Sequence, residues 1–195
     1  MPETVSNYVP QCVTREASRR AGMSAWLVVS AVAVAAVGLI FSAPLLAAAG
    51  HRGLSFVIYR AFAGLCHQLP ERSFDLAGHP LAVCARCAGV FAGFAASALV
   101  YPLARDWRRT DAPPRLWLIL AVLPTAIDFA LHVLGVWPNT HWSRALTGSL
   151  AGAGLVFFVL PGLVQIAESR RAVRSSRGRD EEARPARLEG TRAAA

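Results

Sequence analysis

Three of the chain's four cysteines lie between positions 66 and 87, in a segment that also holds histidine and arginine. Cys66 is followed directly by His67, and Cys84 and Cys87 form a Cys-x-x-Cys pair. Two thiols at this spacing can bind one soft metal ion or close a small disulfide ring. The sequence therefore indicates thiol chemistry in this segment, either metal binding or redox exchange.

A third thiol and a neighbouring histidine favour the metal-binding interpretation. Cys84 and Cys87 lie about one helical turn apart, so both sulfurs can face one ion, and Cys66 can add a third thiolate. His67, or else His79, would complete the tetrahedral Cys3His set that is typical of structural zinc. Zinc is therefore the favoured cofactor, with iron and copper left open because the softness of the ligands does not separate these metals.

The same thiols have two other interpretations. A Cys-x-x-Cys pair at the start of a helix beside Arg86 should have lowered thiol pKa values, which is the condition for thiol–disulfide exchange by Cys84 and Cys87. A membrane bundle with such a pair at one face resembles, in architecture alone, quinone-linked disulfide-forming enzymes of the vitamin K epoxide reductase type. The simplest alternative is that the thiols are small apolar side chains of a buried core.

Thr125, Asp128 and His132 form a second group that could do chemistry. Spacings of three and four residues place all three on one face of a helix. An acid and an imidazole within an apolar segment are costly unless they face the inside of a bundle or a wet cavity. Asp128 and His132 could act as base and acid in catalysis, pair with His67 in a nitrogen–oxygen metal site, or form a hydrogen-bonded pair that fixes helix packing.

Arginines near these two groups indicate a third kind of chemistry, the binding of an anion. Arg72, Arg86 and Arg144 could hold a phosphate headgroup through paired hydrogen bonds, as in a transporter or a lipid-headgroup enzyme. The plainer interpretation of each arginine is a charge that reaches from a helix end to the membrane surface. Ser73 belongs to the same expected polar pocket. It should cap a turn rather than act as a nucleophile, because no Gly-x-Ser-x-Gly elbow surrounds it.

The elements that must position these residues are membrane-spanning helices. The chain has 195 residues, of which 54% are hydrophobic and 16% charged, and this is too apolar for an ordinary soluble domain. Four windows approach the ~20 apolar residues that a helix needs to cross a bilayer. These windows are residues 24–48, 83–103, 116–136 and 144–167. The sequence therefore predicts an all-α integral membrane bundle of four transmembrane helices.

The basic residues indicate how this bundle is oriented. The formal net charge is +8, and every basic residue is an arginine, most of them beside the apolar windows. Arginines precede the first window, fill the gap 104–115 and follow the fourth window, whereas the gap 137–143 has none. By the positive-inside rule both termini are cytoplasmic, and the cysteines lie on the outer side of the cytoplasmic membrane. The expected partners are the lipid bilayer and an unidentified small-molecule or lipid ligand, not nucleic acid.

These patterns divide the chain into three segments. Residues 1–23 are a polar N-terminal tail that holds Cys12, a lone and reduced thiol, and Met23 is a second candidate start. Residues 24–167 form the transmembrane domain. Residues 168–195 form an Arg-rich C-terminal tail that we expect to be disordered.

Shorter features connect and pack the predicted spans. Residues 54–65 are apolar but too short to cross a bilayer, and they predict a helix that lies at the outer interface. Pro70 and the run from Gly78 to Pro80 predict an irregular loop after that helix. Pairs of small residues four positions apart give the second and fourth spans faces for close helix contact. The glycines of these faces are Gly89, Gly93, Gly148 and Gly152.

Taken together, the motifs resemble a known family. Cys-His-Gln-x-Pro-x-Arg-Ser-Phe at 66–74, Cys-Ala-Arg-Cys-x-Gly at 84–89 and an aspartate in the next span closely resemble the signature of domain of unknown function 2085, a family of bacterial and archaeal predicted membrane proteins. The resemblance covers about residues 59–160, with most of the signature in the loop 59–89. It implies a membrane protein, brings no activity with it and leaves open whether the chain is an enzyme. The signature positions that it implies are Cys66, His67, Arg72, Ser73, Cys84, Arg86, Cys87 and Asp128.

Overall fold

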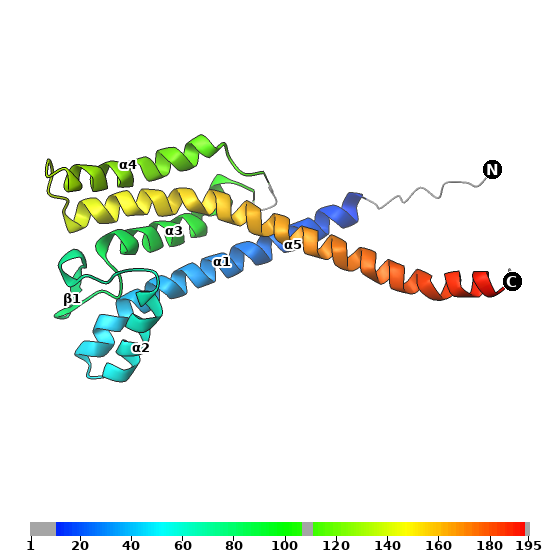
Figure 1. Ribbon diagram of the computed structural model, residues 1–195, viewed down its shortest axis with the longest axis horizontal. Helices are drawn as coiled ribbons and strands as arrows, with labels where there is room; N and C mark the ends of the chain where they lie inside the picture. The colour runs from blue at the N-terminus through cyan, green and yellow to red at the C-terminus, as the bar shows by residue number, and fades with distance from the viewer. Residues whose placement is uncertain (1–10, 107–110, 194–195) are drawn as a thin grey trace.

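The described part of the chain consists of five α-helices and one short β-hairpin, as seen in a computed structural model (Figure 1). The structure describes residues 11–106 and 111–193, with side chains described for 19–106 and 111–175. In chain order the elements are α1 (Gln11–Ala48), α2 (Arg52–Ala63), the 3₁₀ helix η1 (Pro70–Arg72), β1 (Asp75–Leu76), β2 (His79–Pro80), α3 (Ala85–Ala104), α4 (Arg115–Val133) and α5 (His141–Ala193).

Four of these helices are long and apolar enough to cross a membrane. Many large apolar side chains on them are exposed, among them Val28, Leu120 and Leu146, and such a surface suits lipid rather than water. The four-helix all-α membrane architecture predicted from the sequence is confirmed, with boundaries that differ by a few residues from the predicted windows. The membrane-spanning segments are Arg19–Ala48, Ala85–Ala104, Arg115–Val133 and His141–Ser175.

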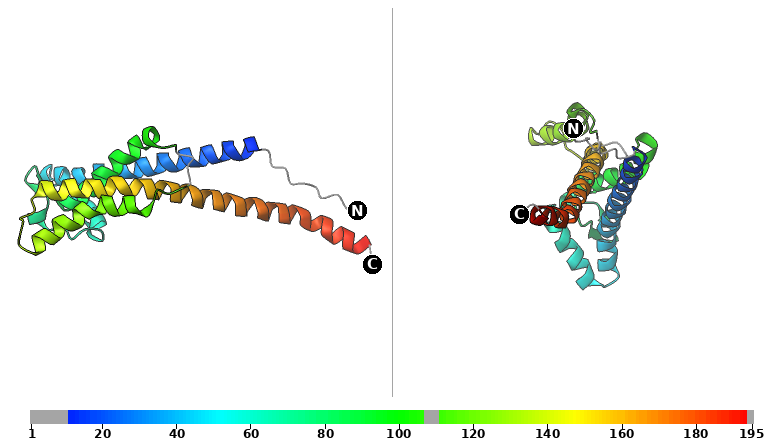
Figure 2. Two further views of the ribbon diagram at one scale, coloured as in Figure 1. Left: turned by 90° about the horizontal axis from the view of Figure 1, so that it is seen from above. Right: turned by 90° about the vertical axis from the view of Figure 1, so that its right-hand side faces the viewer.

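Helix α5 lies at the centre of the bundle. It packs against α3 on one side and α4 on the other, and α1 contacts the opposite side of α3 (Figure 1). Helix α4 is peripheral, because none of its residues is buried. Figure 2 shows that α1 and α5 both extend away from the α2 end of the bundle, although the chain runs in opposite directions in the two helices. A small core joins α3 and α5 through Ala98, Tyr101, Val156 and Leu160, and Trp26 and Val29 of α1 pack against it.

The contact between α3 and α5 depends on glycine. A Cβ atom added to Gly89 would lie 2.0 Å from the carbonyl oxygen of Ala145, and one added to Gly152 would lie 2.1 Å from that of Val90. Comparable clashes would arise at Gly93 and Gly148. The two predicted small-residue faces therefore meet each other, and the two backbones approach more closely than any larger side chain would permit.

Helix α2 folds back against the end of α1. The Ser55 hydroxyl is buried and donates a hydrogen bond to the Ala43 carbonyl oxygen at 2.8 Å, which ties the two helices together. Phe62 on the same buried face joins a core with Ile40 of α1, and the opposite face exposes apolar side chains such as Phe56. This amphipathic helix lies where the sequence predicted an interfacial helix, at Arg52–Ala63 instead of 54–65.

The segment between α2 and α3 is more regular than the irregular loop predicted for it. Leu76 pairs with His79 in a two-residue hairpin, and the residues at its tip, Ala77 and Gly78, have φ values of 54° and 78°. Positive φ at both central residues is typical of the type I′ turn that closes tight hairpins. Gly78, from which the sequence predicted an irregular loop, therefore forms part of a defined turn. Pro80 is tolerated because a sheet of two strands has only edge strands.

The two ends of the chain differ in part from the tails expected there. The described backbone is helical from Gln11 and up to Ala193, and so includes much of both polar segments. Arginine and glutamate are good helix formers, so the apolar helices can continue into these segments. The side chain of Cys12 and residues 107–110, which include two of the arginines in the second gap, lie outside what the structure describes. The three-segment division of the chain stays a prediction.

Candidate metal centre

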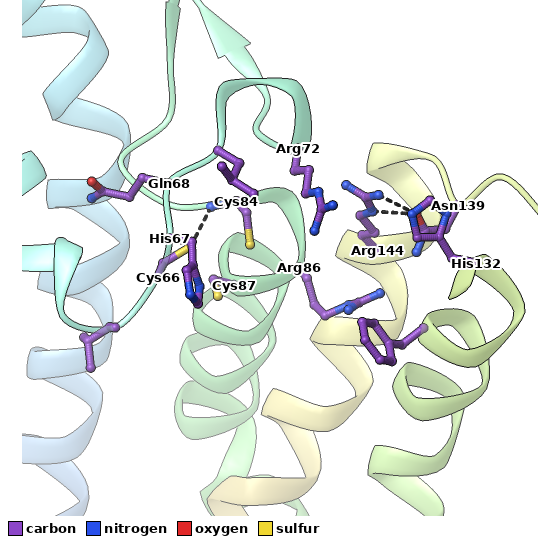
Figure 3. A pocket seen from close by; sticks show the side chains of 13 residues that line it. Cys66, His67, Gln68, Arg72, Cys84, Arg86, Cys87, His132, Asn139 and Arg144 are labelled. Atoms are coloured by element: carbon purple, nitrogen blue, oxygen red, sulfur yellow. Dashed lines mark hydrogen bonds between the residues drawn. The ribbon is translucent and has the colours of Figure 1, made fainter. Parts of the chain in front are cut away.

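Three cysteine thiols meet at the end of the bundle where α2 and the hairpin lie. The sulfurs of Cys66, Cys84 and Cys87 all lie within 4.8 Å of one another (Figure 3). All three thiols are free. Cys66 is buried, with 7% of its surface exposed, and the other two are partly buried. The structure thus brings together the three sulfurs that the sequence predicted to converge.

The position of each sulfur follows from local structure. Cys84 is the residue directly before α3, and Cys87 lies within the first turn of that helix, so their sulfurs can come close together. Cys66 follows α2, where its backbone N–H donates to the Phe62 carbonyl oxygen at 3.0 Å. The backbone N–H of Cys84 donates to the Cys66 sulfur at 3.2 Å. This bond holds the sulfur of Cys66 against the start of α3.

Gln68 clamps the loop that carries Cys66. Its side-chain amide donates to the carbonyl oxygens of Tyr59 and Ala82, both at 2.7 Å, and so joins α2 to the segment before α3. Its backbone has a φ of 52°, which is unusual for a residue other than glycine. Gln68 belongs to the Cys-His-Gln motif, but the sequence predicted no role for it. The sequence feature that could have indicated a role is its position directly after Cys66 and His67.

The Cys84 thiol is strongly favoured as a thiolate. A hydrogen bond from the Cys87 thiol lowers the pKa of Cys84 to about 5, although partial burial acts in the opposite direction. Hydrogen bonds from the backbone N–H of Cys87, from the Cys66 thiol and from the backbone N–H of Arg86 lower this pKa further. The thiolate is the form that binds a metal ion and the form that attacks a disulfide. A thiol of raised acidity therefore suits either chemistry.

Histidine is less closely placed than the sequence predicted. Among the described residues, the group with mutually close ligand atoms contains the three cysteines and no histidine. His67 is exposed and lines the cavity beside the sulfurs. His79 lies in β2, paired with Leu76 in the hairpin. A tetrahedral set would therefore take its fourth ligand from a moved His67 side chain or from a molecule in the cavity.

A cavity of about 380 Å³ opens beside the sulfurs. It lies between the loop after α2 and the adjoining ends of α3, α4 and α5 (Figure 3). Seven of its 13 lining residues are polar or charged, although the chain around it is apolar. The lining residues are Leu65, Cys66, His67, Gln68, Leu69, Arg72, Cys84, Arg86, Cys87, Phe129, His132, Asn139 and Arg144.

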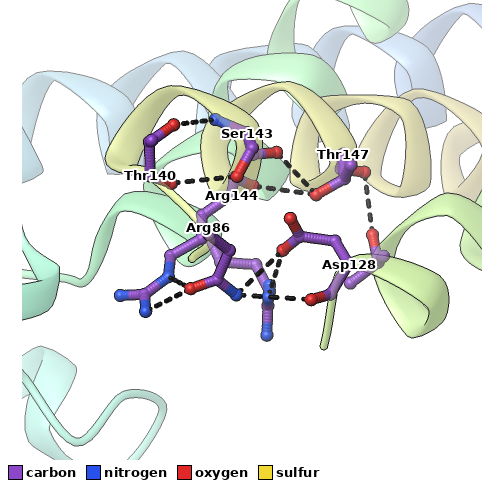
Figure 4. A network of polar contacts seen from close by, with 8 residues as sticks. Arg86, Asp128, Thr140, Ser143, Arg144 and Thr147 are labelled. Carbon is purple, nitrogen blue, oxygen red and sulfur yellow. Dashed lines mark hydrogen bonds and ion pairs between the residues drawn. The ribbon is translucent and has the colours of Figure 1, made fainter. Parts of the chain in front are cut away.

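A polar network fixes two of the arginines in the lining. Arg86 donates to the Asp128 carboxylate at 2.7 Å, and Asn139 donates to the same carboxylate oxygen at 3.1 Å (Figure 4). Arg144 donates to the Asn139 side-chain oxygen through Nε at 2.8 Å and through Nη2 at 2.5 Å. The Asp128 side chain is only 8% exposed. The network thus joins α3, α4 and α5 through partly buried hydrogen bonds, of which those to the Asp128 carboxylate and from the arginines are charge-assisted.

Asp128 and His132 have different surroundings, although both were predicted to lie on one helix face. Asp128 is engaged with Arg86 and Asn139, whereas His132 lines the cavity. Thr125, the third residue of that face, donates to the Thr147 carbonyl oxygen of α5 at 2.8 Å. The face therefore points toward α5 and the cavity. A catalytic role for Asp128 or His132 stays a prediction.

Arg72 and Ser73 are neighbours that point in different directions. Arg72 ends η1 and lines the cavity. Ser73 is buried, and its hydroxyl donates to the Leu69 carbonyl oxygen at 2.9 Å, so it stabilises the turn and is not part of the cavity lining. Of the four residues expected to form a polar pocket, three line this cavity. The structure adds Asn139 and Phe129 to them, two residues for which the sequence predicted no site role.

Comparisons with known proteins bear on this same part of the chain. Residues 66–158 match the family described as predicted membrane protein (DUF2085), and this segment contains every cavity residue except Leu65. An uncharacterised protein of Methanocaldococcus jannaschii is 35% identical over 127 residues, which cover 63% of this chain and 81% of that protein. One of Methanothermobacter thermautotrophicus is 37% identical over 94 residues, which cover 48% and 83%. No solved structure matches the chain.

Proposed function

The chain belongs to the DUF2085 family of predicted membrane proteins, and from that premise we propose that it binds one metal ion through Cys66, Cys84 and Cys87. The observation that carries this proposal is that three sulfurs from two separate segments lie within 4.8 Å of one another. Three thiolates so close together repel one another unless a cation lies between them. A metal ion would supply that cation.

Zinc is the metal that we propose, because thiolate-rich sites with tetrahedral geometry favour it. Iron and copper remain alternatives, since both also accept thiolate ligands. The fourth ligand is the His67 ring after a change of side-chain rotamer, or a molecule that enters from the cavity. A site with three protein ligands and one exchangeable position is typical of catalytic rather than structural zinc.

We place this centre on the outer side of the cytoplasmic membrane. Support comes from the arginine-rich segments beside the other ends of the spans, which the positive-inside rule assigns to the cytoplasm. In Figure 1 the start of α1 and the end of α5 both lie far from α2 and β1, so an even number of spans fits both termini on one side of the membrane. The test is labelling of a cysteine introduced at Ala77, in the hairpin, with a membrane-impermeant reagent in intact cells.

Metal content measures the proposed binding directly. The full-length protein, purified in detergent, should carry one zinc equivalent per chain by elemental analysis. Cys66→Ser, Cys84→Ser and Cys87→Ser should each reduce the metal content strongly, because each removes one of three thiolates. Cys12→Ser is the matched control, since it removes the one cysteine outside the cluster, and it should leave the metal content unchanged. Equal metal content in all five proteins would contradict the proposal.

A second candidate function is thiol–disulfide exchange through Cys84 and Cys87. The lowered pKa of Cys84 at the start of α3 favours it. In that case an oxidised form would hold a disulfide between these two residues, with Cys66 free. Counting free thiols before and after reduction of the unfolded protein separates the two functions. A metal site predicts no change in the count, whereas an exchange pair predicts two additional thiols after reduction.

A further inference from the structure

We propose that the cavity beside the three sulfurs binds a phosphate-type oxyanion through Arg72, Arg86 and Arg144. This inference rests on the proposed function in one respect, because it names the class of ligand that would lie next to the metal ion. It depends on different residues, however, and can therefore be tested separately. The cysteines would hold the cation, and the arginines would hold the anion.

The charge within the cavity is the first reason. Three guanidinium groups line it, and Asp128 compensates the charge of one of them. A zinc ion with three thiolate ligands has a net charge of −1, which compensates a second guanidinium. One positive charge then remains at a cavity edge that is partly shielded from water. An oxyanion would neutralise that charge.

The second reason is that Arg86 and Arg144 are already oriented. Arg86 is held by Asp128, and its guanidinium lies over the ring of Phe129 at 5.7 Å from the ring centre. Arg144 uses two nitrogens on one oxygen of Asn139. Figure 3 shows the Arg144 guanidinium near that of Arg72, whereas Arg86 extends from α3 toward α4. Fixed guanidinium groups lose little freedom when a ligand binds, which favours recognition of an oxyanion.

The third reason is Arg72, whose guanidinium has no hydrogen bond or ion pair with residues 19–106 and 111–175; only its backbone N–H donates, to the Leu69 carbonyl oxygen at 3.0 Å. Its side chain comes from the loop, points toward Arg144 and lines the cavity (Figure 3). Arg72 would therefore close over a ligand that already contacts the other two arginines. Two N–H groups of one guanidinium match two oxygens of a phosphate.

The edge of the cavity shows where the anion could come from. Leu65, Leu69 and Phe129 border it, and each is more than a third exposed. These apolar side chains lie at a helix end where the bilayer surface is expected. Both a lipid headgroup and a free phosphate ion could reach the arginines at this level. Their shared chemistry is the phosphate group, and the experiment must separate the two sources.

The test compares the full-length protein with Arg72→Gln and with Arg60→Gln. Arg60 lies on the exposed face of α2 and does not line the cavity, so its substitution changes the net charge equally. Binding of inorganic phosphate is measured by calorimetry in an uncharged detergent at fixed ionic strength. Loss of one charge-assisted hydrogen-bonding group should weaken binding by about tenfold or more in Arg72→Gln. Arg60→Gln should bind within about twofold of the unmodified protein.

A second arm identifies the source of the phosphate. Phosphate binding is measured in phosphatidylglycerol nanodiscs, with phosphatidylcholine nanodiscs as the reference. If the natural ligand is a lipid headgroup, phosphatidylglycerol should abolish the binding of added phosphate. Binding that persists in both nanodiscs identifies the free ion as the ligand. Either result supports an oxyanion site, provided that Arg72→Gln weakens it. The proposal is overturned if phosphate does not bind in detergent, or if Arg72→Gln and Arg60→Gln bind equally.

Metal content measured on the same samples keeps the two proposals distinguishable. Arg72→Gln should keep the zinc content of the unmodified protein, because Arg72 is no metal ligand. Phosphate binding without metal would contradict the metal site alone, and metal without phosphate binding would contradict the anion site alone. Arg144→Gln provides a second variant: weaker phosphate binding at unchanged metal content supports the anion site, and unchanged phosphate binding contradicts it.

Discussion

The contact between α3 and α5 and the cavity at its end differ in how their residues are brought together. The contact is built from two regular helices, and its essential residues recur at four-residue intervals in each of them. The cavity takes residues from the loop after α2 and from three helix ends. The first region needs only small side chains in a repeated pattern. The second needs particular side chains held by particular hydrogen bonds.

This difference predicts that substitutions in the two regions will have different consequences. Changes in the glycine contact should affect the stability of the whole bundle, because they move two helix axes apart. Changes around the cavity should affect metal binding, anion binding or the rate at which the cysteines are alkylated, while the bundle stays folded. The predictions below test this separation in order of decreasing effect.

The largest effect is expected for Gly152→Ala. The added methyl group would lie 2.1 Å from the Val90 carbonyl oxygen, so α3 and α5 must separate. The free energy of unfolding should fall by about 3 kcal/mol, at the upper end of what overpacking costs. Unfolding of the purified protein by denaturing detergent, followed by circular dichroism, measures this. Gly162→Ala is the matched control on the same helix, because no atom lies within 4 Å of its new methyl group.

The control should be neutral or slightly stabilising, since alanine is favoured over glycine within a helix by up to about 1 kcal/mol. Equal destabilisation by both substitutions would mean that close approach of the backbones does not hold the bundle together.

A smaller effect is expected for Asp128→Asn. The change removes the negative partner of Arg86 in a pair whose side chains are 24% and 8% exposed. We expect a loss of about 2 kcal/mol in the free energy of unfolding, because a partly buried guanidinium loses its charged partner. Asp111→Asn is the control: it breaks an ion pair with Arg105 in which the aspartate side chain is 67% exposed, and should cost well under half as much. A larger loss in the control would contradict this role of Asp128.

Gln68→Ala should loosen the site without affecting the glycine contact. It removes two hydrogen bonds to the Tyr59 and Ala82 carbonyl oxygens, with an expected cost of about 1 kcal/mol. The informative measurement is the alkylation rate of Cys66 in metal-free protein, which should rise because the loop opens more often. Gln165→Ala, at an exposed position of α5, should leave this rate unchanged. An unchanged rate in Gln68→Ala would show that other contacts hold the loop.

The last prediction concerns pH and is measured at one thiol. The hydrogen bond from the Cys87 thiol lowers the pKa of Cys84 to about 5, so in metal-free protein its alkylation should persist until the pH falls to about 5. The same shift stabilises the folded state at a pH above the pKa of about 8.5 that a free cysteine has, and this contribution is lost as the pH falls toward 5. Mass spectrometry of alkylated peptides, with Cys84→Ser as the control, measures the profile. A midpoint near 8.5 would contradict the hydrogen-bonded arrangement.

The same two regions show what the sequence could and could not predict. The spans and the glycine contact follow from composition and periodicity, because every fourth residue of a helix lies on one face. The meeting of Cys66 with Cys84 and Cys87 could be expected from residue types and spacing alone. The loop predicted after α2 is irregular except at η1 and at the two-residue hairpin, where Ala77 takes the positive φ that is usually left to glycine and completes a tight turn with Gly78.

Partners from distant segments could not be predicted. Asp128 was expected near His132, but a salt bridge to Arg86 depends on the rotation of α4 relative to α3, which no local pattern specifies. The role of Asn139 depends on the same packing. His67 was predicted to lie close to the sulfurs, but it is not part of their cluster. Its neighbour Cys66 points to the other sulfurs, and adjacent residues in a loop need not point the same way.

The central claim is that Cys66 joins Cys84 and Cys87 around one metal ion. X-ray absorption at the zinc edge of the purified, metal-loaded protein counts its sulfur neighbours. The account predicts three sulfurs at about 2.3 Å with one nitrogen or oxygen ligand, and two sulfurs in Cys66→Ser. The claim is contradicted if the unmodified protein shows two sulfur neighbours and Cys66→Ser shows the same number.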